Sequence, residues 1–328
     1  MQPSRYAAFA AVERLEGQLT VAQGVVQKHA SNPLFRQTEP WEPRIDNGYP
    51  SVVAPVAGGD RPFQLWYGTC AFGCDRQLLL YANSTDGIAW TKPHLGIFDL
   101  DTADIPELKG LGTRNNVLVE AGGVGVFLDE HEADPSQRYK AIGPGCWTSP
   151  TLSRVGDHAF CGDIGGSSEH HDGGAGRVRS GGHACCRRQL LPASMDPAST
   201  ASLTSTERRF VGQRAASADG LHWRHVANVS WPPPQKWDTQ SNAFYDDALR
   251  RYVVTTRSIP VLKASGGVPE RTISVDVSPS SAWRFDTTRP PQVTLIGSRQ
   301  HQPYAQVTWR WLDVYMGIVA VYDPNDVE

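Results

Sequence analysis

Residues 82–90 read ANSTDGIAW and residues 215–223 read AASADGLHW, so the pattern Ser-x-Asp-Gly-x-x-Trp occurs twice in the chain. A degenerate third copy, VSPSSAW, ends at Trp283. Asp-Gly pairs favour tight turns, because glycine tolerates a positive φ and the Asp side chain bonds nearby backbone amides. We interpret each copy as a turn between strands whose Trp packs on the adjacent layer, rather than as a binding site.

Short runs of β-branched and aromatic residues surround these turns and are separated by further turn signals, a pattern typical of strands. Strand–helix alternation does not recur, so a parallel sheet with crossover helices is not expected. Repeated strand units that share a turn-plus-Trp signature predict an all-β protein, a β-propeller. The strand-like runs cover residues 63–70, 77–84, 116–129, 138–143, 251–258, 271–278, 291–298 and 313–323.

Two segments depart from this pattern. Residues 1–31 form an N-terminal segment that looks weakly helical, and residues 32–328 are predicted to be the propeller domain. Residues 143–206 are rich in Gly, Ser, His and Arg and have almost no apolar periodicity, which predicts a flexible insertion in one blade. Since the chain ends in a strand without another Trp-terminated unit, either the last blade is incomplete or the N-terminal segment completes it.

The composition limits the classes of partner that the protein is expected to bind. The net charge is −3, the pI is near 6.4 and no basic stripe stands out, so nucleic acid is not an expected partner. No apolar run approaches the roughly 18 residues of a membrane helix, and the N-terminus lacks the features of a secretory signal. The sequons at Asn83 and Asn228 are compatible with export, which leaves both a secreted and a cytoplasmic protein open.

The cysteines and histidines match no metal-binding motif. Cys70 and Cys74, in CAFGC, have three residues between them rather than the two of a CxxC motif, so neither a metal nor another cofactor is expected. Disulfides remain open if the protein is exported. The insertion adds further potential ligands whose spacing fits no zinc pattern: His170, His171, His183, Cys185 and Cys186.

Three segments place acids or amides just before a predicted strand. In a propeller the first strand of each blade lines the central channel, so residues that lead into those strands converge on one mouth of the channel. If each segment leads into a first strand, their polar groups meet in one site. The polar residues are Glu42, Arg44, Asp46 and Asn47 in the first segment, Arg114, Asn115 and Asn116 in the second, and Asp238, Gln240 and Asn242 in the third.

Several ordered runs resemble the five-bladed propeller superfamily of glycosidases, which includes glycoside hydrolase families 32 and 43. The resemblance covers roughly residues 32–140 and 207–322 and skips the insertion. It implies a five-bladed β-propeller with a funnel-shaped site that holds three acids. The runs are NPLF, PWEPRIDNGYPSVV, FQLWYG, YANSTDGIAWTKPHLGIF, NNVLV, DPSQRYKAIG, SADGLHW and DTQSNAFYDDALRRYVVTTR.

The resemblance also implies roles for the acids. Asp46 matches the nucleophile or base near the first blade, and Asp238 matches the acid that stabilises the transition state. Glu270 is the nearest candidate for the general acid, with Glu42 as the alternative. Glycosidic cleavage passes through an oxocarbenium-like state, so one carboxylate must face the anomeric carbon while a protonated carboxyl donates to the leaving oxygen.

The expected function is therefore that of a carbohydrate-active propeller, a glycoside hydrolase acting on an oligo- or polysaccharide. Aromatic residues such as Trp41, Trp66 and Trp237 either stack on sugar faces or pack between blades, and core packing is favoured. The predicted substrate-binding residues are Glu42, Arg44, Asn47, Trp66, Arg114, Asn115, Asn116, Gln240, Asn242 and Arg257.

Two other functions stay open. One is a non-catalytic glycan-binding or scaffold propeller, because a fold alone does not establish an activity. The other is a glycoside phosphorylase, which needs a cluster of Arg or His residues for phosphate. The arginines that leave this second possibility open are Arg44, Arg114, Arg257 and Arg271.

Overall fold

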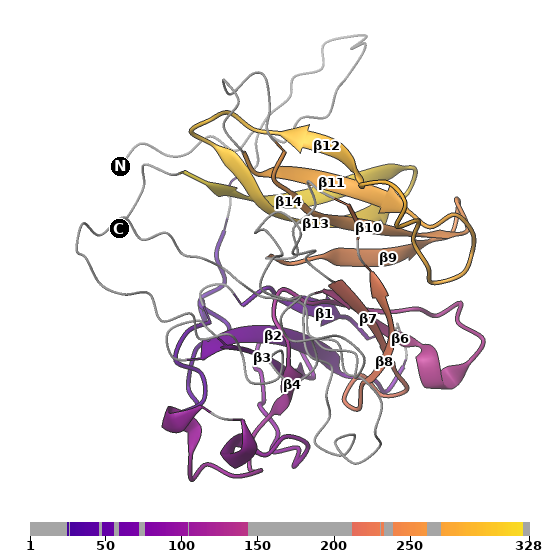
Figure 1. Cartoon of the computed structure of the whole chain (residues 1–328). Helices are drawn as coiled ribbons and strands as arrows, with labels where there is room; N and C mark the ends of the chain where they lie inside the picture. Colours follow the sequence, from indigo (N-terminus) through magenta and orange to yellow (C-terminus); the bar gives the residue numbers. More distant parts are fainter. Residues whose placement is uncertain are drawn as a thin grey trace, which may run out of the picture.

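The strand-like runs form antiparallel sheets in the computed structural model of the chain (Figure 1). The first sheet contains β1 (Ser51–Val53), β2 (Phe63–Ala71), β3 (Arg76–Ser84) and β4 (Val117–Glu120), in that order. The structure describes residues 25, 27–45, 48–55, 59–71, 76–103, 105–143, 212–229, 231–232, 239–260 and 270–323.

The second and third sheets repeat the same simple order of four strands. The second runs β5 (Gly125–Leu128), β6 (Tyr139–Gly143), β7 (Gly212–Ser217) and β8 (Arg224–Val229). The third runs β9 (Asn242–Asp246), β10 (Arg251–Ser258), β11 (Thr272–Val277) and β12 (Gln292–Ile296). Each strand pairs with its neighbour in sequence, which is the local pairing expected of blades.

The fourth sheet differs from the others. Within the described residues it has two strands, β13 (Gln302–Trp311) and β14 (Val314–Tyr322). The remaining regular structure consists of three short 3₁₀ helices, η2 (Leu100–Thr102), η3 (Pro106–Leu108) and η4 (Pro135–Gln137). The prediction of an all-β fold built from blade-like antiparallel sheets is confirmed, and the described residues form four such sheets, the last with two strands.

The predicted insertion begins at the end of β6. Gly143 is the last residue of that strand and pairs with Gln213 of β7, so the chain leaves and rejoins the second sheet at one place. Residues 144–211 lie outside the described residues, as do residues 1–24 of the segment predicted to be weakly helical. No helix in the described ranges is long and apolar enough to cross a membrane.

Both complete copies of the Ser-x-Asp-Gly pattern form the predicted turn, each directly after the third strand of its sheet. Asp86 Oδ1 accepts hydrogen bonds from the backbone N–H groups of Ile88 and Ala89, both at 2.8 Å. In the second copy Asp219 Oδ1 accepts from the N–H groups of Leu221 and His222, again at 2.8 Å. The identical bonds explain why the same residues recur at the same spacing.

The Trp residue that closes each turn packs against a different part of the core, as predicted. Trp90 packs against the cluster around Leu78 and Leu80 on one face of the first sheet. Trp223 belongs to the cluster between the first and second sheets, and Trp283 packs against the cluster between the second and third. The repeated motif therefore contributes to each apolar layer in turn.

Candidate functional site

The segments that lead into the innermost strands lie side by side. Gln240 Nε2, just before β9, donates to the carbonyl oxygens of Tyr49 and Pro50, just before β1, at 3.0 and 3.1 Å. The N–H of Ser241 donates to the carbonyl of Gly123, just before β5, at 3.0 Å. The starts of three blades therefore meet at one end of the molecule, which we call the mouth.

Two glycines allow this close approach. Gly123 has a φ of +60°, and a Cβ added there would lie 2.6 Å from the carbonyl oxygen of Thr239. A Cβ on Gly125 would lie 1.8 Å from the carbonyl oxygen of Ser241. Only glycine fits at these positions, because the backbone that leads into β9 presses directly against them.

The fourth sheet closes the mouth from the other side. The Tyr49 hydroxyl donates to the Tyr304 hydroxyl of β13 at 3.5 Å. Farther down the channel the N–H of Thr308 donates to Asn242 Oδ1 at 2.9 Å, which joins β13 to β9. The predicted residue Asn242 is thus committed to holding two innermost strands together.

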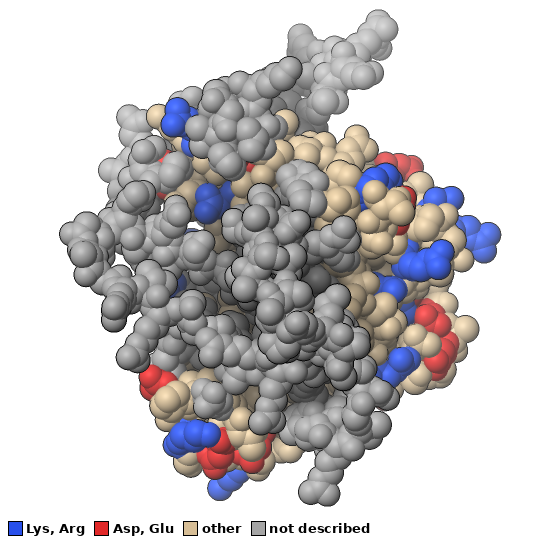
Figure 2. All heavy atoms as spheres, viewed as in Figure 1, with Lys and Arg blue, Asp and Glu red and all other residues tan. Residues whose placement is uncertain are grey.

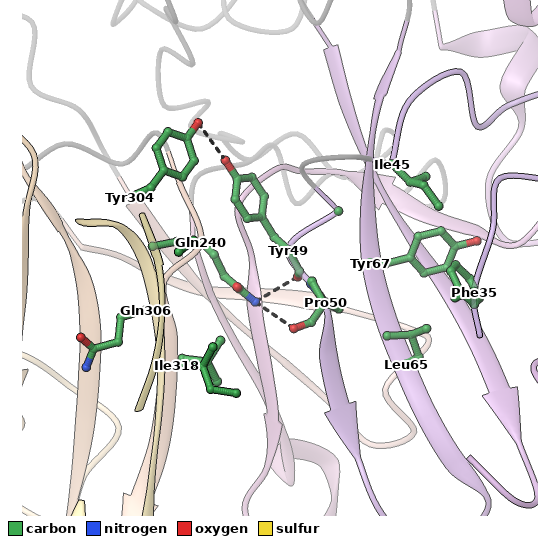
Figure 3. A pocket seen from close by; sticks show the side chains of 14 residues that line it. Phe35, Ile45, Tyr49, Pro50, Leu65, Tyr67, Gln240, Tyr304, Gln306 and Ile318 are labelled. Atoms are coloured by element: carbon green, nitrogen blue, oxygen red, sulfur yellow. Dashed lines mark hydrogen bonds between the residues drawn. The ribbon is translucent and has the colours of Figure 1, made fainter. Parts of the chain in front are cut away.

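A cavity of about 490 Å³ lies between the first sheet and the fourth, beside Tyr49 (Figure 3). Its polar groups come from Tyr49, Gln240, Tyr304 and Gln306. Most of the remaining lining is apolar: Phe35, Ile45, Pro50, Leu65, Tyr67, Ala305, Val307, Ile318 and Ala320. Apolar walls with a few convergent polar groups are typical of small-molecule sites.

Tyr49 has an unusual backbone conformation at the edge of this cavity. Its φ is +43°, a left-handed conformation that a bulky residue adopts only when its surroundings impose it. Burial raises the pKa of Tyr49 well above its usual value, and the neighbouring Tyr304 adds to the shift. The hydroxyl therefore stays protonated, as its hydrogen bond to Tyr304 requires.

Two guanidinium groups lie on the fourth-sheet side of the mouth. The Arg257 guanidinium stands 4.6 Å from the centroid of the Tyr304 ring, and that of Arg271 stands 4.3 Å from the Tyr322 ring. Arg271 also donates to Gln302 Oε1 at 3.3 Å. The two arginines both approach Tyr304, so the structure brings together this pair among the four considered for phosphate.

Glu270 lies beside this pair in the sequence, directly before β11. Its side chain is buried, and its backbone N–H donates to the carbonyl of Pro260 at 3.2 Å. Because β11 pairs with β10 from Thr272 and Ser258 onward, Glu270 lies beyond the same end of the sheet as the start of β9. The candidate general acid is thus at the mouth end of the third blade.

Glu42 is a structural group. Its carboxylate accepts from Lys92 Nζ at 2.6 Å and from the N–H of Thr38 at 3.0 Å, and it also accepts from the Tyr67 hydroxyl. The residue is 2% exposed. Since its oxygens are already engaged inside the protein, it is not placed as the alternative acid or as a substrate contact.

Arg114, Asn115 and Asn116 do not lie at the mouth. They precede β4, which is the outermost strand of the first sheet and not the first strand of a blade. Asn115 and Asn116 are fully buried, and their side chains bond to Phe98 and Tyr81 carbonyls, while Arg114 is exposed. The expectation failed because it took residues 117–119 to be a channel-lining strand.

Trp66 is a core residue. It has no exposed surface and packs against Tyr81 and Tyr139 between the first and second sheets. Its indole N–H donates to the carbonyl of Gly220 at 2.7 Å. Core packing, the interpretation favoured from the sequence, is therefore the one that the structure bears out.

The remaining predicted residues divide into two groups. Arg44 has an exposed side chain, and its carbonyl accepts from the N–H of Cys70 at 3.1 Å, which places it at the end of β2. Cys70 is disulfide-bonded. Asp46, Asn47 and Asp238 lie outside the described residues.

Sequence reasoning missed several residues around the mouth. Tyr49 lies in the segment that leads into β1 but was not among the predicted site residues, and Tyr304 and Gln306 were missed because β13 was not predicted. The run QPYAQVTWRW, residues 302–311, alternates in the way that a strand requires, and this signal could have revealed it. No group of three or more His, Cys, Asp or Glu residues that could hold a metal occurs among the described residues.

The charged side chains of the described residues are spread over the visible part of the surface. Figure 2 shows basic and acidic side chains of the described residues interspersed, with neither sign covering that face alone. This distribution fits the small net charge of −3.

No family model matches the chain, and no curated protein matches it. Among solved structures, similarity is found to an N-acetylgalactosamine deacetylase from F. plautii in complex with blood group B trisaccharide. The two share 11% identity with a TM-score of 0.40, over 79% of this chain and 57% of that one.

Two further solved structures are similar at the same distant level. A glycosyl hydrolase from Bacteroides ovatus shares 13% identity with a TM-score of 0.34, over 87% of this chain and 86% of that one. A fructofuranosidase from Schwanniomyces occidentalis complexed with fructose shares 10% identity with a TM-score of 0.29, over 80% and 49%. All three are structures of carbohydrate-active enzymes, and the chain is distantly similar to them.

Proposed function

We propose that the protein binds a carbohydrate at the mouth and hydrolyses a glycosidic bond there, with Asp46 and Asp238 as the working carboxylates and Glu270 as the general acid. The observation that supports this most directly is the pair of bonds from Gln240 to the Tyr49 and Pro50 carbonyls. These bonds hold together the two segments that carry Asp46 and Asp238 in the sequence.

Hydrolysis of a glycosidic bond requires carboxyl groups from different segments to lie close together. Two carboxyl groups must flank the scissile bond at a separation of roughly 5 to 10 Å, with one of them kept protonated. Asp46 is two residues from Gly48 and Asp238 is adjacent to Thr239 in the sequence, which is what supports assigning both to the mouth. The apolar and aromatic walls of the neighbouring cavity suit the apolar face of a sugar ring.

One observation favours a second candidate function. The described residues that line the cavity supply aromatic rings, two side-chain amides and tyrosine hydroxyls. A protein that binds glycans without cleaving them would need only the aromatic walls and the amide and hydroxyl donors. The second candidate is therefore a non-catalytic glycan-binding propeller.

The test is a screen of aryl glycosides and polysaccharides, run with and without phosphate, followed by Asp46→Asn and Asp238→Asn. Each substitution should lower kcat by roughly 10² to 10⁴-fold without lowering the melting temperature. Asp313→Asn is the matched control, because that carboxylate is fully exposed in the turn at the far end of β13. If Asp46→Asn and Asp238→Asn are as active as Asp313→Asn, the assignment of the two carboxylates is wrong.

Glu270→Gln separates the acid from the other two carboxylates. A general acid matters most when the leaving group is poor, so the variant should lose far more activity on a natural glycoside than on an activated aryl glycoside. Turnover that depends on added phosphate would instead indicate a phosphorylase. Glycan binding without turnover would support the non-catalytic candidate.

A further inference from the structure

The face of the second sheet that packs against the third blade carries two buried cations. Lys140 of β6 pairs with Ala216, and Arg214 of β7 pairs with Ile142. Both cationic side chains lie on this face, because alternate residues of a strand share one face and Ile142 belongs to the cluster between the two sheets. Lys140 is 1% exposed and Arg214 7%. Each of them therefore needs a compensating negative charge.

Lys140 has its compensating charges within the chain. Its Nζ lies 2.8 Å from Glu132 Oε2 and 3.3 Å from Asp129 Oδ2. It also donates a hydrogen bond to the carbonyl oxygen of Gln137 at 2.9 Å. These oxygens replace the water that the ammonium group loses on burial.

Arg214 differs from Lys140 in this respect. None of the described residues forms an ion pair with its guanidinium, and its Nε is buried without a hydrogen-bond acceptor among them. Burial, and then the positive charge of Arg284, lower the pKa of Arg214 to about 10. The described part of the chain thus surrounds this guanidinium with an environment that disfavours its charge.

A second unsatisfied donor lies beside the guanidinium. Arg214 Cζ is 5.9 Å from the centroid of the Trp283 ring. The indole N–H of Trp283 is also buried without an acceptor among the described residues. Edge-on contacts with Phe127, Tyr252 and Phe285 hold the ring in place. Two donors therefore lie side by side where the described residues supply no acceptor, and each unmade hydrogen bond is costly.

We propose that a small monovalent anion, of the size of chloride, binds between the second and third blades and is held by the Arg214 guanidinium and the Trp283 indole N–H. The anion accepts hydrogen bonds from both donors and compensates the buried positive charge. Neither residue lines the cavity beside Tyr49, so this site is separate from the one proposed for the carbohydrate.

The burial and charge of Arg214 determine the class of ligand. The residue is 7% exposed, so the position suits a single ion rather than a sugar. One guanidinium balances one negative charge, and a divalent anion would bury a second charge at a larger desolvation cost. Because Arg214 comes from the second blade and Trp283 from the third, the bound anion joins the two blades. Binding to the folded state alone makes stability rise with the anion concentration.

Urea unfolding at constant ionic strength tests the proposal, with the bulkier anion isethionate replaced stepwise by chloride. The urea midpoint of the wild type should rise with chloride and then level off. Arg214→Met should show no such rise. Without chloride this variant should be at least as stable as the wild type, because an apolar side chain of similar length replaces an uncompensated buried charge.

Two further variants sharpen this measurement. Arg224→Met is the matched control, because it removes an exposed arginine of the same sheet and should keep the chloride dependence of the wild type. Trp283→Phe keeps an aromatic ring but removes the N–H donor, so its chloride affinity should fall several-fold. Equal chloride dependence of the wild type and Arg214→Met would overturn the proposal.

Chloride NMR measures binding directly. The excess linewidth of the chloride signal should be several-fold larger with the wild type than with Arg214→Met, and bromide should reverse it by competition. An equal linewidth with both proteins would show that chloride does not bind at Arg214. If sulfate, but not chloride, stabilises the wild type relative to Arg214→Met, the ligand is a divalent anion and the proposal is wrong.

Discussion

The turn at residues 84–90 and the turn at residues 217–223 have the same hydrogen bonds but different surroundings. In the first, Gly87 is half-buried, and a Cβ added there would make ordinary contact with the Phe63 ring at 3.4 Å. In the second, Gly220 is buried, and a Cβ would lie 2.6 Å from Trp66 and 3.1 Å from Tyr139. The second turn therefore packs directly against Trp66 of the first blade.

This difference separates local from tertiary contributions. Both glycines have nearly the same positive φ, +73° and +76°, so the backbone conformation disfavours a side chain equally at the two positions. Only Gly220 also offers its carbonyl to Trp66, at 2.7 Å. A motif can therefore form the same structure twice and still contribute unequally to stability.

The largest effect is expected for Gly220→Ala. Left-handed strain and the clash with Trp66 together should lower the free energy of unfolding by about 3 kcal/mol. Gly87→Ala has the same strain without the clash and should cost about 1 kcal/mol. Urea unfolding of both variants measures the difference, and equal losses would show that the tertiary contact is unimportant.

A smaller effect is expected for Trp66→Phe. The change removes ring contacts and leaves the Gly220 carbonyl without its donor, for a loss of about 2 kcal/mol. Because the smaller ring also relieves the clash, combining Trp66→Phe with Gly220→Ala should cost less than the sum of the two. A double-mutant cycle measures this coupling. The losses of stability caused by Trp66→Phe and by Gly87→Ala should instead add in the double variant.

The smallest effect concerns pH. Burial alone would raise the pKa of Asp219, but hydrogen bonds from His222, Leu221 and Ser217 outweigh it and lower the pKa to about 2. A depressed pKa gives stability that is present above the ordinary value, near 4, and is lost as pH falls towards 2. The stability difference between the wild type and Asp219→Asn should therefore shrink over this range.

Asp86→Asn sharpens the same measurement. Hydrogen bonds from the backbone of Ile88 and Ala89 and from Ser84 also lower the pKa of Asp86, so its pH dependence should have the same sign. Urea midpoints at several pH values between 2 and 5 give both comparisons. A difference from the wild type that stays constant with pH would contradict the role of the ionised carboxylates.

The connection between the first two blades shows where sequence reasoning was limited. Residues 116–129 look like one strand-like run, yet they contain two strands of different sheets: β4 ends at Glu120 and β5 begins at Gly125. Gly122 and Gly123 let the chain cross from the outer edge of one blade to the channel. Mistaking β4 for a channel strand is what moved Arg114, Asn115 and Asn116 to the predicted site.

The candidate site was predicted in part for the same reason. Gln240 and Arg257 were chosen from the sequence and do lie at the mouth. Gln240 was found because the segment before β9 was correctly recognised as leading into a first strand. Glu42 was chosen from the same kind of segment but turns inward to Lys92. Nothing in the local sequence distinguishes these two outcomes, because Glu42 depends on a partner 50 residues away and Gln240 on partners about 190 residues away.

The sequence by itself determined the turns and most of the strands. Asp-Gly pairs, β-branched runs and glycines act through the backbone of their own neighbourhood, so their effect can be read within a few residues. Tertiary structure alone decided which strand of each sheet lines the channel and which polar groups face the mouth. Those outcomes depend on contacts between segments far apart in the chain, and burial, not local preference, selects among them.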